Sequence, residues 1–366
     1  MGHINKNFGT QDEEIAPPLM NIGLIGWMKE NLFSSVSNTI LTILGVLLLA
    51  KIVPPLVEWA FLESAWNTPP EGCRAAEGAC WSIISQNIKF ILFGFYPQDL
   101  LWRPIATMLI LVVLVAFSWN RKNWSKPLLY AWLAGFICMA LFMRGGILGL
   151  PHVEVTKWSG LPLTLLLSIT TMVFAYPVGV FLALGRQSRL PAVKSFCIIF
   201  IELIRGVPMI SLLFMAAIMF PLFTPEGLTI HKIIRAQIAF IFFSSAYIAE
   251  VVRGGLQGMD QGQYEAADSI GLNYRQKMQF VVLPQVLKTV IPPTVSILIV
   301  AFKDTSLLVL VALYDLLNTT QSVLSDPLWM GFSAEAYIFV ALLYFAGSFT
   351  MSSYGRRLER ELSTEH

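Results

Sequence analysis

Charged residues are scarce in this sequence, and several of them stand near the ends of apolar segments. One pattern occurs twice: Glu202 is followed three residues later by Arg205, and Glu250 by Arg253, each arginine preceding a glycine. Residues three apart share a helical face, so each carboxylate can neutralise its arginine where charge is costly. Two interpretations stay open. The pairs stabilise one state of an inward gate, or the arginines anchor the helices at lipid headgroups.

A second polar group interrupts an apolar run where that run ends. Lys303, Asp304, Thr305 and Ser306 supply a cation, an anion and two hydroxyls. A zwitterionic substrate needs a partner for its carboxylate and another for its ammonium group, so these four residues are candidate substrate contacts. The alternative is an ordinary helix end, at which Lys303 and Asp304 satisfy each other.

Hydroxyl residues also lie within an earlier apolar segment. Thr164 and Ser168 are four residues apart and therefore share a helical face. They are candidates for the same substrate pathway. Small hydroxyl residues in membrane helices also hold neighbouring helices together, and this second interpretation stays open.

The sequence lacks the residues that several other chemistries require. It contains no G-x-x-x-x-G-K-[ST] segment, so the chain is not expected to bind a nucleotide, to carry a cofactor of its own or to be an enzyme. Its four histidines fall in tails or loops. Haem or di-metal oxidoreductases of membranes need ligands that face each other within the bilayer, so this class is disfavoured and no metal site is predicted.

Composition indicates the elements that must position these residues. The chain is 55% hydrophobic and 13% charged, against about 25% charged for soluble proteins. This balance predicts an all-α polytopic membrane protein with about eight transmembrane helices. The expected spans are 36–61, 104–119, 128–143, 161–184, 196–220, 233–252, 289–302 and 334–353.

The loops between these spans differ in charge. Lysine and arginine concentrate in alternate loops, including 120–127, 185–195 and 253–288, and in the C-terminal tail. Because positive residues favour the cytosolic side, we predict that both termini and these loops are cytoplasmic. The insert 62–103 then lies outside, and its apolar piece 83–96 is too short to cross, so it is expected to be a surface or re-entrant helix.

The outer insert contains two of the four cysteines. Cys73 and Cys80 share it, in a compartment that permits disulfides, and they are predicted to form one. Cys138 and Cys197 fall inside predicted spans, where they are expected to act as small apolar residues.

A polar segment from Glu265 to Pro284 separates two strongly apolar runs. The run from Glu265 to Asp268 favours a first helical turn, because acidic groups suit the positive end of a helix. Gly271 supplies a bend, and Pro284 is expected to close a second short helix. The bland alternative is an ordinary amphipathic connection.

The spacing within this segment resembles the EAA loop of ABC importer permeases. Glu-Ala-Ala is followed after three residues by glycine, and after nine more by Val-Val-Leu-Pro, with Val281 where that family usually has isoleucine. The resemblance implies that the loop 254–288 couples the chain to a separate ATPase. Its implied coupling residues are Glu265, Ala266, Ala267, Gly271, Leu272, Leu283 and Pro284.

Further blocks are similar to the polar amino-acid branch of these permeases. They are LPLTLLLS (161–168), ALGRQSRLPAV (183–193), IELIRGVPMISLLF (201–214), AYIAEVVRGGL (246–256) and FKDTSLL (302–308). Val207 departs from the usual threonine, and Asp260 stands where proline is common. The long N-terminal extension looks like the M-type permease of general L-amino-acid importers.

The resemblance implies an organisation and an activity. Residues 1–35 would be a cytosolic segment, 36–154 an extension with three spans, and 155–366 the five-helix permease core. The chain would translocate amino acids by alternating access in the bacterial inner membrane. Its implied partners are ABC ATPase subunits that bind ATP and Mg, a second permease that is either different or identical, and a periplasmic amino-acid-binding protein. No nucleic-acid partner is implied.

Two other classes compete with this interpretation. A self-contained, ion-coupled secondary transporter would need buried carboxylates near mid-membrane and usually inverted repeats, whereas the carboxylates here cluster at span ends. A structural membrane scaffold would not require the Glu-Ala-Ala spacing. Co-purification with an ATPase would separate the first interpretation from both of these.

Overall fold

The computed structural model describes residues 23–147, 149–225 and 230–363. The chain divides into two compact units: an N-terminal unit, up to Ala65 with Glu71–Cys80, and a main unit, Trp66–Pro70 with Trp81 onward. The described part is helical, which confirms the predicted all-α class. The predicted N-terminal segment lies outside the described residues up to position 22.

The N-terminal unit consists of α1 (Gly23–Asn31), α2 (Val36–Val57) and most of α3 (Pro70–Ala75). The Ser35 hydroxyl caps α2 by accepting a hydrogen bond from Asn38 N at 3.1 Å. A π-helical turn extends α2 to Leu62, which gives an apolar helix of 27 residues. At 1.5 Å per residue this helix is about 40 Å long, enough to cross a bilayer, as the first predicted span requires.

A short disulfide-bonded region follows this helix. Cys73 and Cys80 are joined by a disulfide, with a Cα–Cα distance of 5.4 Å. Backbone hydrogen bonds from Ala65 N to Ala79 O (2.8 Å) and from Ala79 N to Trp59 O (2.7 Å) hold the same region. The disulfide and these backbone hydrogen bonds therefore close the region, in which Cys73, Ala79 and Cys80 are buried.

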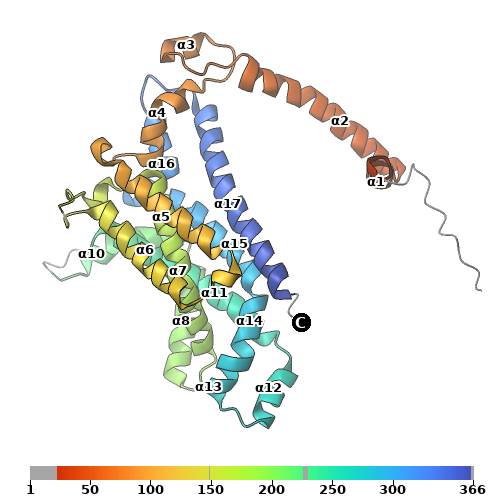
Figure 1. The fold of residues 1–366 in the computed structure, drawn as a ribbon, viewed down its shortest axis with the longest axis vertical. Coiled ribbons are helices and arrows are strands. Elements are labelled where there is room, and N and C mark those ends of the chain that lie inside the picture. Colours follow the sequence, from red (N-terminus) through yellow and green to blue (C-terminus); the bar gives the residue numbers. More distant parts are fainter. Residues whose placement is uncertain (1–22, 148, 226–229, 364–366) are drawn as a thin grey trace, which may run out of the picture. The chain divides into compact units, whose positions relative to one another are not determined.

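The main unit is a bundle of long apolar helices (Figure 1). Its full-length spans are α5 (Trp102–Ser118), α6 (Lys126–Arg144), α7 (Gly160–Arg186), α11 (Lys232–Gln257), α15 (Ile291–Asp304, extended to Val311 by a 3-10 turn) and α17 (Ser333–Ser363). The pair α7 and α11 forms its centre. At Gly179 the two backbones approach so closely that a Cβ there would lie 2.8 Å from Cβ of Ile248.

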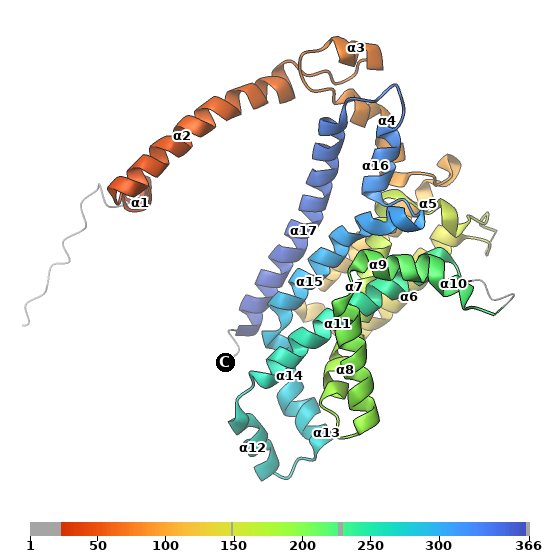
Figure 2. The ribbon, with the colours of Figure 1, turned by 180° about the vertical axis from the view of Figure 1, so that it is seen from behind.

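The predicted span 196–220 is not one continuous helix. It is a broken pair, α8 (Pro191–Gly206) and α9 (Met209–Phe214) with its continuation through a π-turn and α10 (Phe220–Leu222), bent by 106° (Figure 2). Val207 is extended (φ −110, ψ 132) because the following Pro208 disfavours helical geometry before it and lacks an N–H. Among the described helices, seven can cross a membrane, or eight if this pair counts as one span.

The guanidinium of Arg235 supports the second half of the broken pair. It donates from Nη1 to the carbonyl of Ala216 at 3.0 Å and to that of Ala217, both within the π-turn Met215–Met219. It also donates from Nε to Ile230 O at 3.1 Å. Backbone groups released by an irregular turn must be satisfied inside a membrane, and here one arginine from α11 satisfies them.

Two shorter helices, α4 (Ser82–Phe93) and α16 (Leu316–Leu324), pack against each other in the main unit. The apolar piece predicted as a surface or re-entrant helix is α4. The Thr319 hydroxyl of α16 donates to Ile91 O at 2.7 Å. With Ile83 and Ile91 fully buried, α4 is part of the packed core.

Candidate coupling and gating site

The coupling segment folds as two antiparallel helical pieces at one end of the main unit (Figures 1 and 2). The first is α12 (Gln261–Ser269). The second runs through α13 (Tyr274–Lys277), a π-turn (Met278–Val282) and α14 (Leu283–Thr289). Gly271, at φ +81, makes the turn between them, with Gly271 N bonded to Asp268 O (2.9 Å) and Leu272 N to Ala267 O (3.1 Å). This is a Schellman ending, which favours glycine.

Two details of the predicted loop are corrected. The first helix begins at Gln261 rather than Glu265, because the Asp260 carboxylate caps it by accepting from Gly262 N at 2.8 Å. Pro284 does not close the second helix; it lies in the first turn of α14. The preceding π-turn changes the hydrogen-bond register, so the missing N–H and the ring of the proline are accommodated.

The Glu-Ala-Ala run divides between two faces of α12. Glu265 and Ala266 are exposed, whereas Ala267 is buried. Two large apolar side chains of the segment are also exposed, Ile270 at 73% and Phe280 at 65%. A polar segment that presents isoleucine and phenylalanine to its surroundings has the character of a docking surface.

The two pieces are tied to each other side by side. Lys277 Nζ lies 2.5 Å from Asp268 Oδ1, and Gln285 Nε2 donates to Gln263 Oε1 at 2.9 Å. An Asn273–Gln276 capping box starts the second piece. These contacts make the segment a cross-braced hairpin of helices, which we call the coupling hairpin (260–289).

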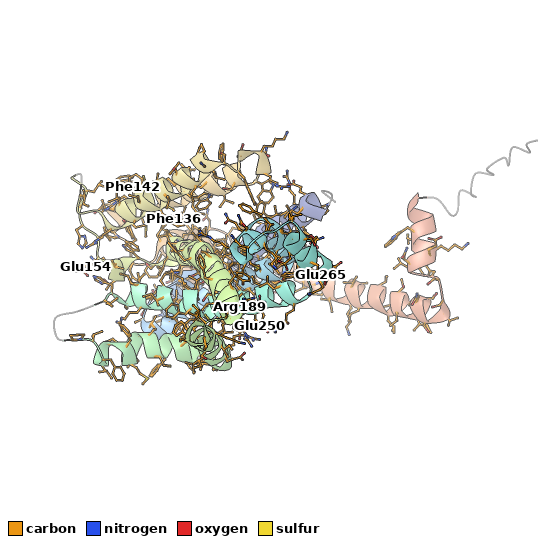
Figure 3. The ribbon with its side chains drawn as sticks, turned by 90° about the horizontal axis from the view of Figure 1, so that it is seen from below. Phe136, Phe142, Glu154, Arg189, Glu250 and Glu265 are labelled. Carbon is orange, nitrogen blue, oxygen red and sulfur yellow. A yellow bond between two sulfur atoms is a disulfide. The ribbon has the colours of Figure 1, made fainter. Side chains whose placement is uncertain are left out.

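A cluster of charges lies where α7, α8 and α11 approach the same end. The Glu250 carboxylate receives both 3.0 Å bonds from Arg253 Nε, lies 3.4 Å from Arg205 Nη1 and lies 3.5 Å from Arg186 Nη1. Arg253 Nη1 also donates to Gln257 Oε1 at 2.6 Å, at the last residue of α11. Glu250, which is labelled in Figure 3, is therefore the centre of the cluster.

The expected ion pair between Glu202 and Arg205 is not formed. Glu202 bonds instead to Arg186 of α7 at 2.9 Å, and Arg205 turns to Glu250 and to the ring of Tyr247, 5.6 Å from its centroid. The predicted pair Glu250–Arg253 is present. Arg186, which the spacing argument did not single out, joins all three helices because it contacts both carboxylates.

The candidate pathway residues separate in the structure. Asp304 lines a cavity of about 340 Å³ between α11 and α15, together with Ser244, Tyr247 and Ser296. Lys303 is exposed and does not line this cavity. Thr305 does not line this cavity either. It is buried, and its hydroxyl lies within hydrogen-bond distance of Phe302 O (2.8 Å) and Tyr344 Oη (3.3 Å).

The remaining candidates have structural contacts. Thr164 is fully buried and its hydroxyl donates to Gly160 O at 3.1 Å and accepts from Leu316 N at 3.1 Å. Ser168 is buried and donates to Thr164 O at 2.5 Å. The carbonyl of Ser306 accepts from Asn318 Nδ2 at 3.1 Å. None of these three lines the Asp304 cavity.

Asp315 forms the polar centre that sequence reasoning missed. It is fully buried, caps α16 through Asn318 N (2.9 Å) and accepts from Tyr344 Oη at 2.6 Å. Burial raises the pKa of its carboxyl, and the hydrogen bonds from Tyr344 and Asn318 oppose that rise. The sequence did contain a signal for this role. Asp315 follows an apolar run and stands where an aspartate can cap the start of a helix by accepting from the backbone N–H three residues later, at Asn318.

Comparison with known proteins connects this geometry to a family. Residues 175–364 match the family described as "Binding-protein-dependent transport system inner membrane component", which covers α11, the coupling hairpin and the charge cluster. These residues are slightly more than half of the chain.

Similar proteins extend the match beyond that region. The chain is 43% identical to the inner membrane amino-acid ABC transporter permease protein YhdY of Escherichia coli strain K12, covering 92% of this chain and 93% of the relative. It is 37% identical to the glutamate/glutamine/aspartate/asparagine transport system permease protein BztC of Rhodobacter capsulatus, with 98% of both covered. The probable glutamine permease GlnP of Bacillus subtilis is 32% identical; it matches 55% of this chain and is 91% covered. The chain therefore belongs to the permease family of binding-protein-dependent ABC importers, as its coupling spacing predicted.

Proposed function

We propose that this permease translocates amino acids across the bacterial inner membrane. It forms half of a pore with a second permease, receives its substrate from a periplasmic binding protein and is driven by ABC ATPase subunits that bind ATP and Mg. The amino-acid assignment draws support from the names of the relatives that match nearly the whole chain. The proposed organisation keeps an extension at 36–154 and a core at 155–366.

The observation that carries the ATP-coupled function is the coupling hairpin. A loop between two spans that only connected them would have no need of internal cross-braces or of an exposed isoleucine and phenylalanine. Both features suit a rigid element that fits a groove on another subunit. The relatives are ABC permeases, so they give the ion-coupled alternative no support.

Reconstitution of the whole importer tests this function. The permease, its partner permease and the ATPase are placed in proteoliposomes with the binding protein, and uptake of a panel of labelled amino acids is followed. We expect uptake that requires ATP hydrolysis. Uptake that a proton or Na⁺ gradient drives without ATP would overturn the proposal in favour of a secondary transporter.

Asp304 is the proposed contact for the substrate ammonium group. It is the acidic residue of the cavity between α11 and α15, beside Ser244 and Ser296. We expect Asp304→Asn to lower uptake at least tenfold, because a charge-assisted hydrogen bond contributes about 1.5–3 kcal/mol, which corresponds to roughly 10- to 150-fold. The measurement is initial uptake rate against amino-acid concentration. Asp326→Asn, an exposed carboxylate outside that cavity, is the matched control and should transport normally.

The proposed topology places both termini and the coupling hairpin in the cytosol. Exposed positions Gln187 and Gly262 test the inner side, and Thr224 tests the outer side. In a background without free cysteines, impermeant thiol reagents should label cysteines at the first two positions only in inverted vesicles. A cysteine at 224 should react in intact cells. Labelling of position 262 from outside would contradict this topology.

A further inference from the structure

An apolar groove lies between α5 and α6, the N-terminal spans of the main unit, and the helices α7, α15 and α17. Its volume is about 520 Å³, and its walls come from α5, α7 and α17, with Trp132 of α6 and Phe302 of α15. Residues such as Val112, Ile169, Ala346 and Thr350 line it. The helices that form it are membrane spans, so the groove lies within the bilayer. Water molecules would be poorly stabilised in this groove, because it offers few polar groups for hydrogen bonds.

One end of the groove is defined by bonded aromatic groups. Ser118, the last residue of α5, accepts from Trp132 Nε1 through its hydroxyl (2.9 Å) and from Tyr354 Oη through its carbonyl (3.3 Å). The rings of Trp119 and Tyr354 are 4.9 Å apart. Tryptophan and tyrosine with satisfied polar atoms mark the level of the lipid headgroups. This end therefore meets the membrane surface.

Two cations follow this end of the groove in sequence, Lys122 in the 3-10 turn Arg121–Asn123 after α5 and Arg357 within α17. Lys122 follows Trp119 by three residues, and Arg357 follows Tyr354 by three on the lining face of α17. Arg357 also pairs with Glu361 at 2.7 Å, an exposed pair that contributes little by itself. Arg121 and Arg356 stand beside them in sequence. A basic rim above an apolar groove complements a molecule with an anionic head and an apolar tail.

We propose that this groove binds one anionic phospholipid, with an acyl chain along α5 and α17 and the phosphate between Lys122 and Arg357. The lipid fills the gap between the extension and the core and thereby joins the two parts. The apolar walls of the groove favour the acyl chain of the lipid, and the two cations favour its anionic head group. The inference does not depend on the identity of the transported solute.

Native mass spectrometry of the assembled importer, extracted into detergent and supplied with phosphatidylglycerol or phosphatidylcholine, tests the proposal. We expect one phosphatidylglycerol to remain bound per copy of this chain and phosphatidylcholine to be washed away. In Lys122→Gln/Arg357→Gln the preference should fall about fivefold per cation removed, because each contributes about 1 kcal/mol.

Two variants of α17 separate the groove from the general lipid surface. Ala346→Phe fills the groove and should abolish retention, whereas Ala341→Phe changes an exposed alanine outside it and should retain the lipid. Matching elution and melting temperature of both variants exclude misfolding. Equal retention by the two variants, equal loss from them, or equal binding of both lipids by the unmodified chain would each overturn the proposal. Absence of bound lipid from the assembled importer would do so too, by assigning the groove to a protein helix.

Discussion

Gly271→Val is expected to lower ATP-driven transport about tenfold while the chain still inserts and assembles its spans. Gly271 has φ +81, a left-handed conformation that costs a branched side chain roughly 1–2 kcal/mol. There is open space around the position, since an added Cβ meets no atom within 4 Å. The cost therefore comes from the backbone alone, and relieving it turns α13 away from α12. The measurements are uptake in proteoliposomes and ATPase activity with and without binding protein.

Gly271→Asn is the matched control for this experiment. Asparagine tolerates left-handed geometry and adds a side chain of similar size, so the turn and the transport rate should be largely retained. A loss of activity in both variants would indicate that bulk at this surface, and not backbone geometry, is responsible. Normal uptake by Gly271→Val would contradict the role of the hairpin as coupling element.

Glu250→Gln is expected to lower the stability of the complex more than the matched change Glu202→Gln. The change leaves Arg186, Arg205 and Arg253 with one fewer carboxylate, at a site where the Glu250 side chain is only 23% exposed. A charged hydrogen-bond partner at a partly buried site contributes about 1.5–3 kcal/mol, and repulsion among the arginines adds to the cost. We expect the melting temperature of the purified complex to fall by several degrees and transport to fall with it.

Glu202→Gln removes a carboxylate from the same cluster and serves as the control. Glu202 is 55% exposed and, among the described residues, its carboxylate forms a salt bridge with Arg186 only, so its loss should cost less than about 1 kcal/mol. The melting temperatures of the two variants, compared under identical detergent conditions, decide the ranking. If Glu202→Gln were the more damaging, the centre of the cluster would be Arg186 and not Glu250.

Hydropathy and spacing predicted most of this fold. Apolar runs such as 161–184 and 233–252 located α7 and α11 because a bilayer requires one continuous apolar helix per crossing. The Glu-Ala-Ala spacing identified the coupling hairpin because its turn depends on a local glycine signal at Gly271. Both inferences rest on short-range rules, which a single sequence carries in full.

Long-range partners could not be predicted in the same way. Glu202 prefers Arg186, sixteen residues away on another helix, over Arg205 on its own helix. Asp315 meets Tyr344 across the gap between α16 and α17. The break at Val207 and Pro208 did have a local signal, but the hydropathy of 196–220 is continuous through the bend and outweighed it.

In the proposed coupling, α15 tilts about Val290, the residue that separates it from α14. Because the two pieces of the coupling hairpin are cross-braced, a force on the hairpin would be transmitted to α14, and α15 begins one residue beyond the end of α14. The fourteen residues of α15 form an arm about 21 Å long, at 1.5 Å per residue. A tilt of about 10° at its base would move the Asp304 end by roughly 4 Å over this arm. A displacement of that size is comparable to the width of an amino-acid backbone, so in the proposed coupling a small rotation at the ATPase contact would be enough to open or close the cavity wall.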